Sequence, residues 1–556
     1  MLLNLQKNLS TKQNKKLIFF LCLGITIFLG AFFRFYNLHW DQGYFFHPDE
    51  RNIANAVSKI KFFSQLNPGF FAYGSLPIYL YRFVGDVLVA ITKNQDWVLE
   101  WPKINLIGRG FSAFFSTISL ILVFLLSKKL FNKKIAFLAT FFTAFCPSLV
   151  QTAHFSVTES MLVFWVLLVM IFSFKITEKA SFKNYFLLGI ICGMAIATKT
   201  SALSFLVIPL FAHLFFHLKD IKAYLKGLLT LVITFLTFSL FSPYVFLAKD
   251  KFLESMHYEG GIVLGTLKVV YVLQFEKTLP YLFQLKNFLW QIGPVASLSV
   301  LGIIVLLIFA FKKKDKRIFV FLSFPITYFL YVGFWYTKFI RYMIPLLPFL
   351  SISLSFVLYQ IYLKKKIIGK TIITLSLLTS FLWTLAFFSI YLKEPTRITA
   401  SKWIYENIKK DSQILTEHWD DGLPLDLRKG KHPSLYKIDQ LTVYEADNLD
   451  KLNYYAERLS QGDYIILNSR RLYGTLIHLE EKYPLTSKYY RLLFKEKLGY
   501  NKVAEFSVYP SIFNFEIKDD KSEETFQVYD HPKVIIFENQ KQLNEEEIKN
   551  ILNIYD

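Results

Sequence analysis

Residues 15–50 read KKLIFFLCLGITIFLGAFFRFYNLHWDQGYFFHPDE: two lysines, an apolar run and, at the end, the adjacent acids Asp49 and Glu50. The apolar run, 17–36, has the length of about 20 residues that a helix needs to cross a bilayer. Basic residues favour the cytoplasmic side of a span, so the N-terminus is expected inside and Asp49 and Glu50 outside. No small-residue cleavage site follows the run, which favours an uncleaved first span over a signal peptide. Carboxylates this close to a bilayer are costly to desolvate and are typical of functional sites.

The composition of the remaining chain is typical of a polytopic membrane protein. Of its 556 residues 53% are hydrophobic and 59 are phenylalanine, which is unlike a soluble globular protein. The 63 basic and 42 acidic side chains give a formal charge of +21. Basic residues stand in short runs between apolar segments, as cytoplasmic loops do, so membrane lipid is the expected environment and nucleic acid is not an expected partner. Cys22, Cys146 and Cys192 lie in apolar segments and give the polar parts no disulfide framework.

About eleven apolar runs are expected to span the plasma membrane. They are 17–36, 108–127, 134–151, 157–175, 184–199, 201–217, 226–247, 289–311, 317–335, 342–363 and 370–391. Lysine-rich connections, such as 128–134 and 312–317, recur at every second connection and are expected in the cytoplasm. The connections expected outside are 37–107, 152–156, 248–288, 336–341 and everything after about residue 392. Residues 76–91 are either a surface helix or a further span. Two spans more or fewer would preserve this sidedness, whereas one would reverse it.

The tail differs from the rest in composition, so two domains are predicted. Residues 1–392 form the transmembrane domain, with 37–107 as its first outer loop, and 393–556 form an extracytoplasmic α/β domain. In the tail, 463–467 and 533–537 have the pattern of short buried strands, and 398–410, 449–460 and 470–482 have helical spacing of apolar residues. Asp530-His531 is interpreted as a turn before a strand rather than as a catalytic pair, because Pro532 follows it.

Ionisable and polar residues gather at the predicted outer ends of the spans. They are His47, Asp49, Glu50, Arg109, His154, Glu159, Lys199, Lys338, Arg341 and Tyr342. A carboxylate can take a proton from an acceptor hydroxyl or amine, while lysine and arginine stabilise a departing phosphate. A phosphate anchored in lipid would hold its head group at this depth. The residues therefore predict one outer-leaflet pocket for glycosyl transfer from a polyprenyl-phosphate sugar.

Each of these residues also has a structural explanation, and the sequence leaves both open. Asp49 and Glu50 would also suit a helix N-terminus near Arg51, because acids favour that position. Taken singly, each of the cations is explained by interfacial anchoring with an extended side chain, and only their common sidedness favours a shared site; these cations are Arg109, Lys199 and Arg341. The remaining structural alternatives are a turn histidine at His154 and a helix cap at Glu159.

Several segments, in order and spacing, resemble a family of membrane enzymes. They are FRFY (33–36) with HPDE (47–50), GSLPIYL (74–80), GRGFSA (108–113), CPS (146–148) with HFSVTES (154–160), GMAIATK (193–199) and RYMIPLLP (341–348). In these segments the chain resembles the GT-C membrane glycosyltransferases, and specifically the bacterial relatives of protein O-mannosyltransferases and lipid A aminoarabinose transferases. The resemblance implies a GT-C-like helical membrane domain that uses a phospholipid carrier.

The resemblance also implies roles for individual residues. The acid of the first outer loop, matched by Asp49 with Glu50 beside it, serves as general base or positions the acceptor. Arg109 matches a position associated with donor recognition, and Lys199 and Arg341 match basic positions that contact the lipid phosphate. The resemblance leaves the role of Glu159 open, because relatives usually have aspartate there. Some relatives use a divalent cation near this site and others do not, so the resemblance leaves metal dependence open.

The expected function is inverting-type transfer of a hexose or pentose to a protein, glycolipid or glycan acceptor on the outer face of the membrane. His47, His154, Glu159 and Tyr342 are expected to help bind substrate. A flippase for lipid-linked sugar is the first alternative, but transporter sites lie near the bilayer midplane, whereas the span centres here contain almost no ionisable groups. A membrane scaffold with an outer binding domain is the second alternative.

Overall fold

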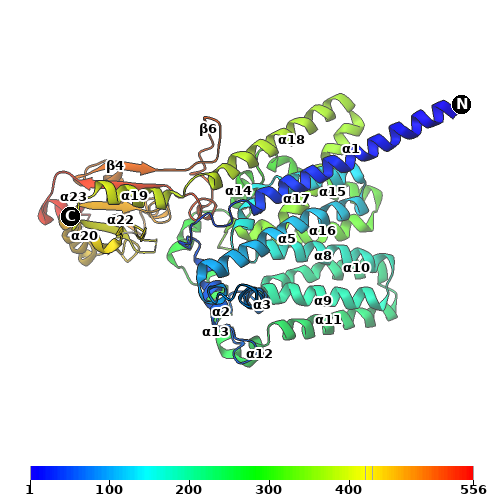
Figure 1. Cartoon of the computed structure of the whole chain (residues 1–556), viewed down its shortest axis with the longest axis horizontal. Helices are drawn as coiled ribbons and strands as arrows, with labels where there is room; N and C mark the ends of the chain where they lie inside the picture. The colour runs from blue at the N-terminus through cyan, green and yellow to red at the C-terminus, as the bar shows by residue number, and fades with distance from the viewer. Residues whose placement is uncertain (1, 420, 429, 555–556) are drawn as a thin grey trace. The chain divides into compact units, whose positions relative to one another are not determined.

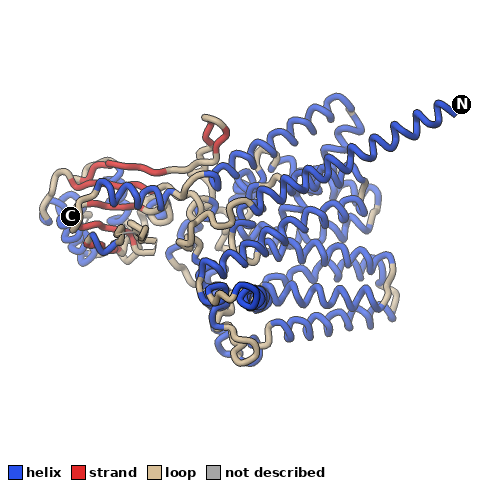
Figure 2. Tube along the Cα trace, viewed as in Figure 1, coloured by secondary structure: helices blue, strands red, loops and turns tan. Residues whose placement is uncertain are grey.

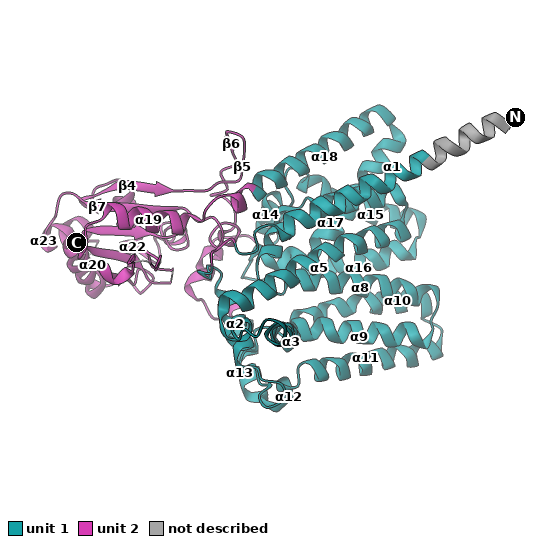
Figure 3. Ribbon diagram, in the orientation of Figure 1, with its two compact units in different colours: residues 1–39, 43–260, 280–388 teal, residues 40–42, 261–279, 389–556 magenta. Residues whose placement is uncertain are grey.

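The structure is a computed structural model that describes residues 2–419, 421–428 and 430–554, with side chains from residue 14 onward. The chain divides into two compact units (Figure 3). Unit 1 comprises residues 1–39, 43–260 and 280–388, and unit 2 comprises residues 40–42, 261–279 and 389–556. The first unit is helical, and the second contains the strands (Figure 2).

Long apolar helices that lie side by side make up most of unit 1 (Figure 1). The α-helices that begin in this unit are α1 (Leu2–Phe35), α2 (Pro48–Lys59), α3 (Ser75–Thr92), α4 (Asp96–Leu99), α5 (Trp101–Leu130), α6 (Lys133–Ala144), α7 (Pro147–Gln151), α8 (Glu159–Glu178), α9 (Phe182–Thr198), α10 (Val207–His217), α11 (Ile221–Phe241), α12 (Tyr244–Leu247), α13 (Lys249–Leu264), α14 (Leu282–Ile292), α15 (Ala296–Lys313), α16 (Lys316–Val332), α17 (Leu347–Lys364) and α18 (Lys366–Phe388). Three short 3₁₀ helices accompany them, η1 (Thr152–His154), η2 (Thr200–Leu206) and η4 (Ile340–Leu346). α9 packs along α11, α5 packs on α6 and α8, and α17 packs on α6 and α15.

By length and composition, nine helices in the described part of the chain are apolar enough to cross a membrane, or ten if a bent pair counts as one span. The chain is therefore a multi-pass membrane protein. The expected number was about eleven; two of the expected spans, α9 and α16, have 17 residues each and fall just short of the 18 required for that count. One of the nine, α3, is seen nearly end on in Figure 1, whereas the long helices run across the view. Its direction favours the surface-helix alternative for residues 76–91.

Two of the expected continuous spans are broken. The run 134–151 forms α6 and then α7 with η1, bent by 61°. Proline at 147 cannot continue α6, and the side chain of Arg34 donates hydrogen bonds to the carbonyl oxygens of Thr143 and Ala144 at 3.0 Å, which satisfies the end of α6. The run 289–311 begins as the end of α14, stops at Gly293 with φ +89°, and resumes in α15.

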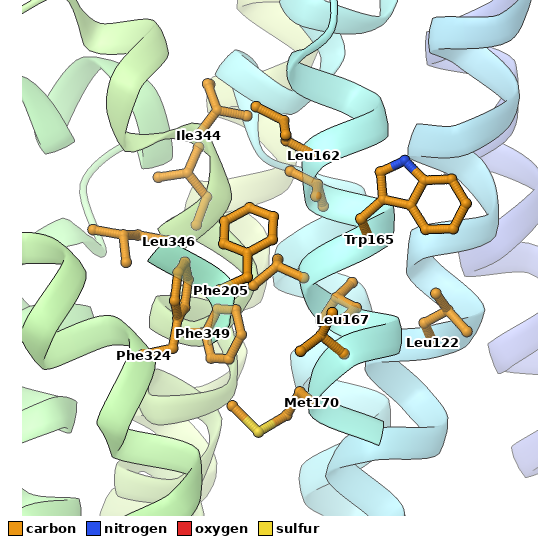
Figure 4. Packing of buried hydrophobic residues seen from close by; sticks show 14 of the residues in the cluster. Leu122, Leu162, Trp165, Leu167, Met170, Phe205, Phe324, Ile344, Leu346 and Phe349 are labelled. Atoms are coloured by element: carbon orange, nitrogen blue, oxygen red, sulfur yellow. The ribbon is translucent and has the colours of Figure 1, made fainter. Parts of the chain in front are cut away.

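Buried apolar side chains from many helices form the core of unit 1. In Figure 4, Phe205, Phe324 and Phe349 lie on one side of α8, and Trp165 of α8 points to the other side. The one polar atom of the Trp165 ring is satisfied, because its indole nitrogen donates to Thr198 Oγ1 at 2.9 Å. Helices packed in this way hold the ends of the bundle in fixed positions.

Unit 2 is built on a five-stranded sheet in the order β2-β1-β3-β7-β4. The strands of this unit are β1 (Gln413–Glu417), β2 (Lys437–Leu441), β3 (Tyr464–Leu467), β4 (Tyr500–Phe506), β5 (Ser511–Ile512), β6 (Phe515–Glu516) and β7 (Val534–Asn539). Its helical elements are η3 (Val270–Phe275), η5 (Ser389–Leu392), α19 (Thr396–Asn407), η6 (Pro433–Leu435), α20 (Leu449–Gln461), α21 (Tyr473–Leu476), α22 (Pro484–Phe494), η7 (Glu524–Phe526) and α23 (Glu545–Leu552). β1 pairs in parallel with β2 and β3, whereas β7 is antiparallel to β3 and β4. The expected fold class, a polytopic helical protein with a C-terminal α/β part, is confirmed.

Most local expectations for the tail agree with the structure, and one is wrong. The expected strands correspond to β3 and β7, and the first two expected helices to α19 and α20. The third, 470–482, contains only the four-residue helix α21. Leu472, Leu476 and Leu479 are buried as their spacing predicts, but Leu472 precedes α21, and Leu479 follows it in a turn closed by the i→i+3 hydrogen bond from the Leu479 N–H to the carbonyl oxygen of Leu476.

His531 lies in a turn before β7 and is held between two carboxylates. Its Nδ1 lies 2.5 Å from Asp530 and its Nε2 lies 2.7 Å from Asp519, and all three side chains are fully buried. Tyr391 also donates a hydrogen bond to Asp530 at 2.9 Å. Burial alone would lower the pKa of His531, but the two carboxylates outweigh it and raise that pKa to about 10. The cluster is therefore a buried charged network inside unit 2.

Candidate active site in unit 1

The first turn of α2 positions Asp49. Pro48 stands at the start of the helix, and His47 is the cap, since its Nδ1 accepts a hydrogen bond from the Asp49 backbone N–H at 3.2 Å. His47 is nearly buried, and burial, the largest effect, lowers its pKa. The capping task that the sequence left open for Asp49 and Glu50 thus falls to His47, and both carboxylates are available for other partners.

Asp49 pairs with Arg341 and accepts a hydrogen bond from the Tyr73 hydroxyl at 2.7 Å. Arg341 comes from η4, just before α17, so the pair joins segments far apart in the chain. Burial would raise the pKa of Asp49, but Arg341, then His47 and Tyr73, oppose it and hold that pKa well below its usual range. The Asp49 side chain keeps 21% of its surface exposed, and that of Arg341 keeps 26%. A ligand can therefore reach both groups.

Lys199 and Glu159 form a second ion pair next to Asp49. Lys199 Nζ lies 3.1 Å from Glu159 Oε1 and 4.7 Å from the centre of the Tyr73 ring. Tyr73 thus lies against the lysine of one pair while its hydroxyl contacts the acid of the other. Glu159 is nearly buried, and its Oε2 has no hydrogen-bond partner among the described residues. A buried carboxylate oxygen without a hydrogen bond is uncommon in folded proteins, which makes Glu159 a candidate for contact with a ligand.

A close contact at Gly74 places Tyr73 beside Lys199. The Gly74 N–H donates to the carbonyl oxygen of Thr198 at 3.0 Å, at the end of α9. A Cβ atom on Gly74 would lie 1.9 Å from the carbonyl oxygen of Ala197, so only glycine fits. The segment GSLPIYL therefore begins with the residue that locks the first loop onto α9.

Glu50 and Arg109 form a third pair that is sealed inside the protein. Arg109 donates from Nε and Nη2 to the two oxygens of Glu50 at 2.8 and 2.6 Å, and Glu50 also accepts from the Ser156 backbone N–H at 2.5 Å. The exposed fractions are 0% for Glu50 and 2% for Arg109. Neither side chain has surface with which to touch a substrate in this conformation. Their arrangement ties α2, α5 and the segment before α8 together.

Two further residues predicted to bind substrate, His154 and Tyr342, lie in different surroundings. Both ring nitrogens of His154 lie 2.9 Å from carbonyl oxygens, those of Val150 and Tyr36, and the residue is fully buried. That is the environment of a structural histidine. Tyr342 lies next to Arg341, whose guanidinium is 5.8 Å from the centre of its ring.

Two cluster members, Tyr73 and Glu259, were not predicted from the sequence, and the predicted Lys338 comes shortly before Arg341 in the chain. The sequence predicts no role for Tyr73, or for Glu259 of α13, which lies in a long connection. Burial is the largest effect on Glu259 and raises its pKa; Arg341 opposes this, while Asp49 adds to it. Lys338 donates to the carbonyl oxygen of Tyr336 at 2.8 Å, and burial lowers its pKa to about 8. Glu259 interacts electrostatically with Arg341 and Asp49 because the three side chains are close in space, and no sequence pattern indicates that closeness.

The described residues contain no group of three or more His, Cys, Asp or Glu side chains arranged to hold a metal ion. The cluster consists instead of paired acids and cations around one phenol. Carboxylates at Asp49 and Glu159, cations at Arg341 and Lys199, and the Tyr73 hydroxyl together suit an anionic ligand that also carries hydroxyl groups.

Comparisons with known proteins agree with the resemblance seen in the sequence. Residues 103–241 match the family described as dolichyl-phosphate-mannose-protein mannosyltransferase. The Archaeoglobus fulgidus oligosaccharyltransferase, in a crystal structure with zinc and sulfate, is similar at a TM-score of 0.54 and 14% identity, covering 88% of this chain and 72% of that one. Its apo form gives a TM-score of 0.52 at 13% identity, covering 90% and 75%.

A third solved structure, ArnT from Cupriavidus metallidurans in the apo state, gives a TM-score of 0.49 at 14% identity, covering 84% of this chain and 95% of that one. No curated protein shows a significant sequence match. At these identities the structural matches concern the fold. Residues 103–241 thus match the family described as dolichyl-phosphate-mannose-protein mannosyltransferase, and the chain has the fold of the Archaeoglobus fulgidus oligosaccharyltransferase.

Proposed function

We propose that this chain is a glycosyltransferase that moves a sugar from a polyprenyl-phosphate donor to an acceptor on the outer face of the plasma membrane. The observation that carries the proposal is the open ion pair of Asp49 with Arg341, flanked by Tyr73 and by the Lys199–Glu159 pair. The family matched by residues 103–241 is named for a lipid-phosphate sugar donor and a protein acceptor, which supports the same chemistry here. The N-terminus is cytoplasmic in this proposal, and unit 2 is extracytoplasmic.

The two accessible cations are the proposed binding site for the donor phosphate. Arg341 offers a planar fork of N–H donors that suits phosphate oxygens, and Lys199 offers a point charge beside it. Each is neutralised by an acid in the free protein, so a phosphate has to compete with Asp49 and Glu159 for them. Because of that competition, donor binding changes the pairing of Asp49 with Arg341 and therefore the pKa of Asp49.

Asp49 is the proposed group that orients the acceptor and takes its proton. While Arg341 is its partner, the depressed pKa of Asp49 makes it a weak base. When the donor phosphate draws Arg341 away and adds its own negative charge, the pKa of Asp49 rises. The acceptor hydroxyl or amine then attacks the anomeric carbon, its proton passes to Asp49, and the bond from that carbon to the phosphate oxygen breaks. Polyprenyl phosphate leaves with the electron pair, and the configuration is inverted.

Glu50 and Arg109 are assigned a positioning role in this proposal. Their buried pair fixes the first turn of α2, and so sets where the neighbouring Asp49 points. A divalent cation, in a version of the reaction that uses one, would be held by Asp49 and the donor phosphate, because magnesium commonly binds through one carboxylate and substrate phosphates. The first acceptor to test is protein, since a related oligosaccharyltransferase structure contains an acceptor peptide; glycolipid and glycan are the others.

The test uses the purified chain in liposomes that contain radiolabelled polyprenyl-phosphate hexoses and pentoses, with membrane extracts as acceptors. Asp49→Asn should abolish the transfer of label. Asp86→Asn, which removes an exposed acid paired with Arg82 on α3, is the matched control and should leave transfer unchanged. Full turnover by the Asp49→Asn variant would refute the assignment. Movement of the lipid-linked sugar between leaflets without any labelled acceptor would favour the flippase alternative.

A further inference from the structure

Unit 2 contains a small β-hairpin, residues 511–516, that is separate from its five-stranded sheet. Among the described strands, β5 and β6 pair only with each other, and the hairpin projects from the unit (Figure 3). Phe513 at its tip is 100% exposed, and Phe515 is 73% exposed. A two-stranded ribbon on its own is marginally stable in water, and grouped exposed apolar side chains mark a surface that meets something else.

The backbone at the tip is strained as well as exposed. Phe513 adopts φ +53°, a left-handed conformation that costs energy for a bulky side chain and that glycine or asparagine would adopt more easily. Its complete exposure means that no described residue packs over the ring to offset this cost. Strain held at an exposed tip is typical of a functional contact.

The base of the hairpin is fixed to the point where α18 ends. The Ser511 backbone N–H donates to Ser389 Oγ at 3.0 Å, and Lys393 Nζ donates to Ser511 Oγ at 3.0 Å. Ser389 follows Phe388, the last residue of the apolar helix α18, directly in the chain. Leu392, in the same short element η5 as Ser389, is 57% exposed. Hydrogen bonds within unit 2 therefore tie the base of the hairpin to Ser389, the residue that follows α18 in the chain.

The reach of the hairpin matches the thickness of the lipid interface. A strand rises about 3.3 Å per residue, so the Cα atom of Phe513 lies within about 7 Å of that of Ser511. The headgroup layer of each leaflet is about 5–8 Å thick. Aromatic side chains are enriched at that depth.

We propose that the hairpin 511–516 docks into the phospholipid headgroup layer on the side of the membrane where α18 ends, and that Phe513 and Phe515 enter it. The insertion holds unit 2 at the membrane surface. Glu516 and Lys518 beside the tip carry opposite charges, so the docking is apolar and does not need anionic lipid. It depends on α18 crossing the membrane and not on the proposed glycosyl transfer.

The experiment uses the full chain with its three cysteines replaced by alanine, in phosphatidylcholine nanodiscs. An environment-sensitive fluorophore is attached at Glu516→Cys, which keeps both phenylalanines, and at Val503→Cys as a control on the partly exposed strand β4. We expect blue-shifted emission and quenching by brominated lipid at position 516, and neither at position 503. Adding Phe513→Ser and Phe515→Ser should return the emission at 516 to that of the control, while high salt should leave the unsubstituted hairpin's signal unchanged.

Three results would overturn the proposal. Emission at 516 equal to that at 503 would show that the tip stays in water. A blue shift that persists in the double serine variant would show that the phenylalanines do not cause it. Loss of the shift in high salt would show an electrostatic contact instead. The two phenylalanines are exposed, so replacing them leaves the folded core untouched, and the transfer assay reads out separately.

Discussion

Arg341 and Asp49 are 292 residues apart in the chain, and their side chains form an ion pair. The pair is accessible, whereas the neighbouring pair of Arg109 with Glu50 has almost no exposed surface. An accessible pair can exchange a partner for a ligand, while a buried one can only be broken at a cost. Substitutions at the first pair should therefore act on activity, and those at the second on stability.

Replacement of Arg341 by glutamine should weaken donor binding and shift the acid limb of the activity profile. Arg341 is the strongest opponent of the burial that raises the pKa of Asp49, so its loss lets that pKa rise. In the unsubstituted enzyme Asp49 stays ionised down to very low pH; in the variant, activity that needs the ionised form falls as the pH drops through the raised pKa. We expect at least a tenfold rise in KM for the lipid donor and an acid limb at higher pH. Steady-state rates between pH 4.5 and 8 measure both, and an unshifted acid limb would contradict the pairing.

The buried pair should respond to single substitutions with a loss of stability. Glu50→Gln leaves the Arg109 charge buried without its counter-charge, which typically costs about 3–5 kcal/mol. Arg82→Gln breaks the more exposed pair with Asp86 on α3 and should cost less than about 1 kcal/mol. Thermal unfolding in detergent, followed by intrinsic fluorescence, compares the two. A combined Glu50→Gln and Arg109→Met variant should be less destabilised than the sum of its parts, because no lone charge remains; additive losses would argue against direct coupling.

The large features of the fold could be predicted because each depends on nearby residues. Apolar length predicts α5 or α8, and the short strands β3 and β7 follow from their buried runs. The sequence does not predict the break after α6, because it depends on Pro147 together with Arg34, 113 residues earlier, satisfying the freed carbonyls. Whether a segment forms a helix or a strand depends on its own residues and can be predicted from them. The partner of a buried polar group lies far away in the chain and cannot.

The candidate site shows the same division. The shared end of the spans suggested that Asp49, Lys199 and Arg341 would meet, and the structure brings them together. Sequence spacing could not show that Glu50 is sealed against Arg109 while Asp49 beside it is open, because adjacent helical residues point about 100° apart and burial depends on the neighbouring helices. The contribution of Glu259 depends on where α13 packs, which no local pattern specifies.

Gly74→Ala should disrupt the site without touching any charged group. The added Cβ would lie 1.9 Å from the carbonyl oxygen of Ala197, so the loop must move away from the end of α9. That movement would separate the Tyr73 ring from Lys199 Nζ. We expect transfer to fall by at least tenfold. Gly110→Ala is the control, since a Cβ there meets nothing within 4 Å in a helix and should be neutral or slightly stabilising. Equal activity of the two variants would show that the close contact at Gly74 does not position the site.

The network of His531 with Asp519 and Asp530 should make the stability of unit 2 depend on pH in the alkaline range. The pKa of His531 is about 10 in the folded protein and near its ordinary 6.5 in the unfolded chain. A raised pKa contributes stability that is complete below pH 6.5 and is lost as the pH rises through 10. His531→Gln should lower the melting temperature at pH 6 by several degrees and should flatten its decline between pH 7 and 10. Replacing the exposed His432 by glutamine is the control and should leave that decline unchanged. Melting curves that fall in parallel for the wild type and His531→Gln would show that another group causes the alkaline loss, and the charged histidine would then have no part in holding the turn before β7.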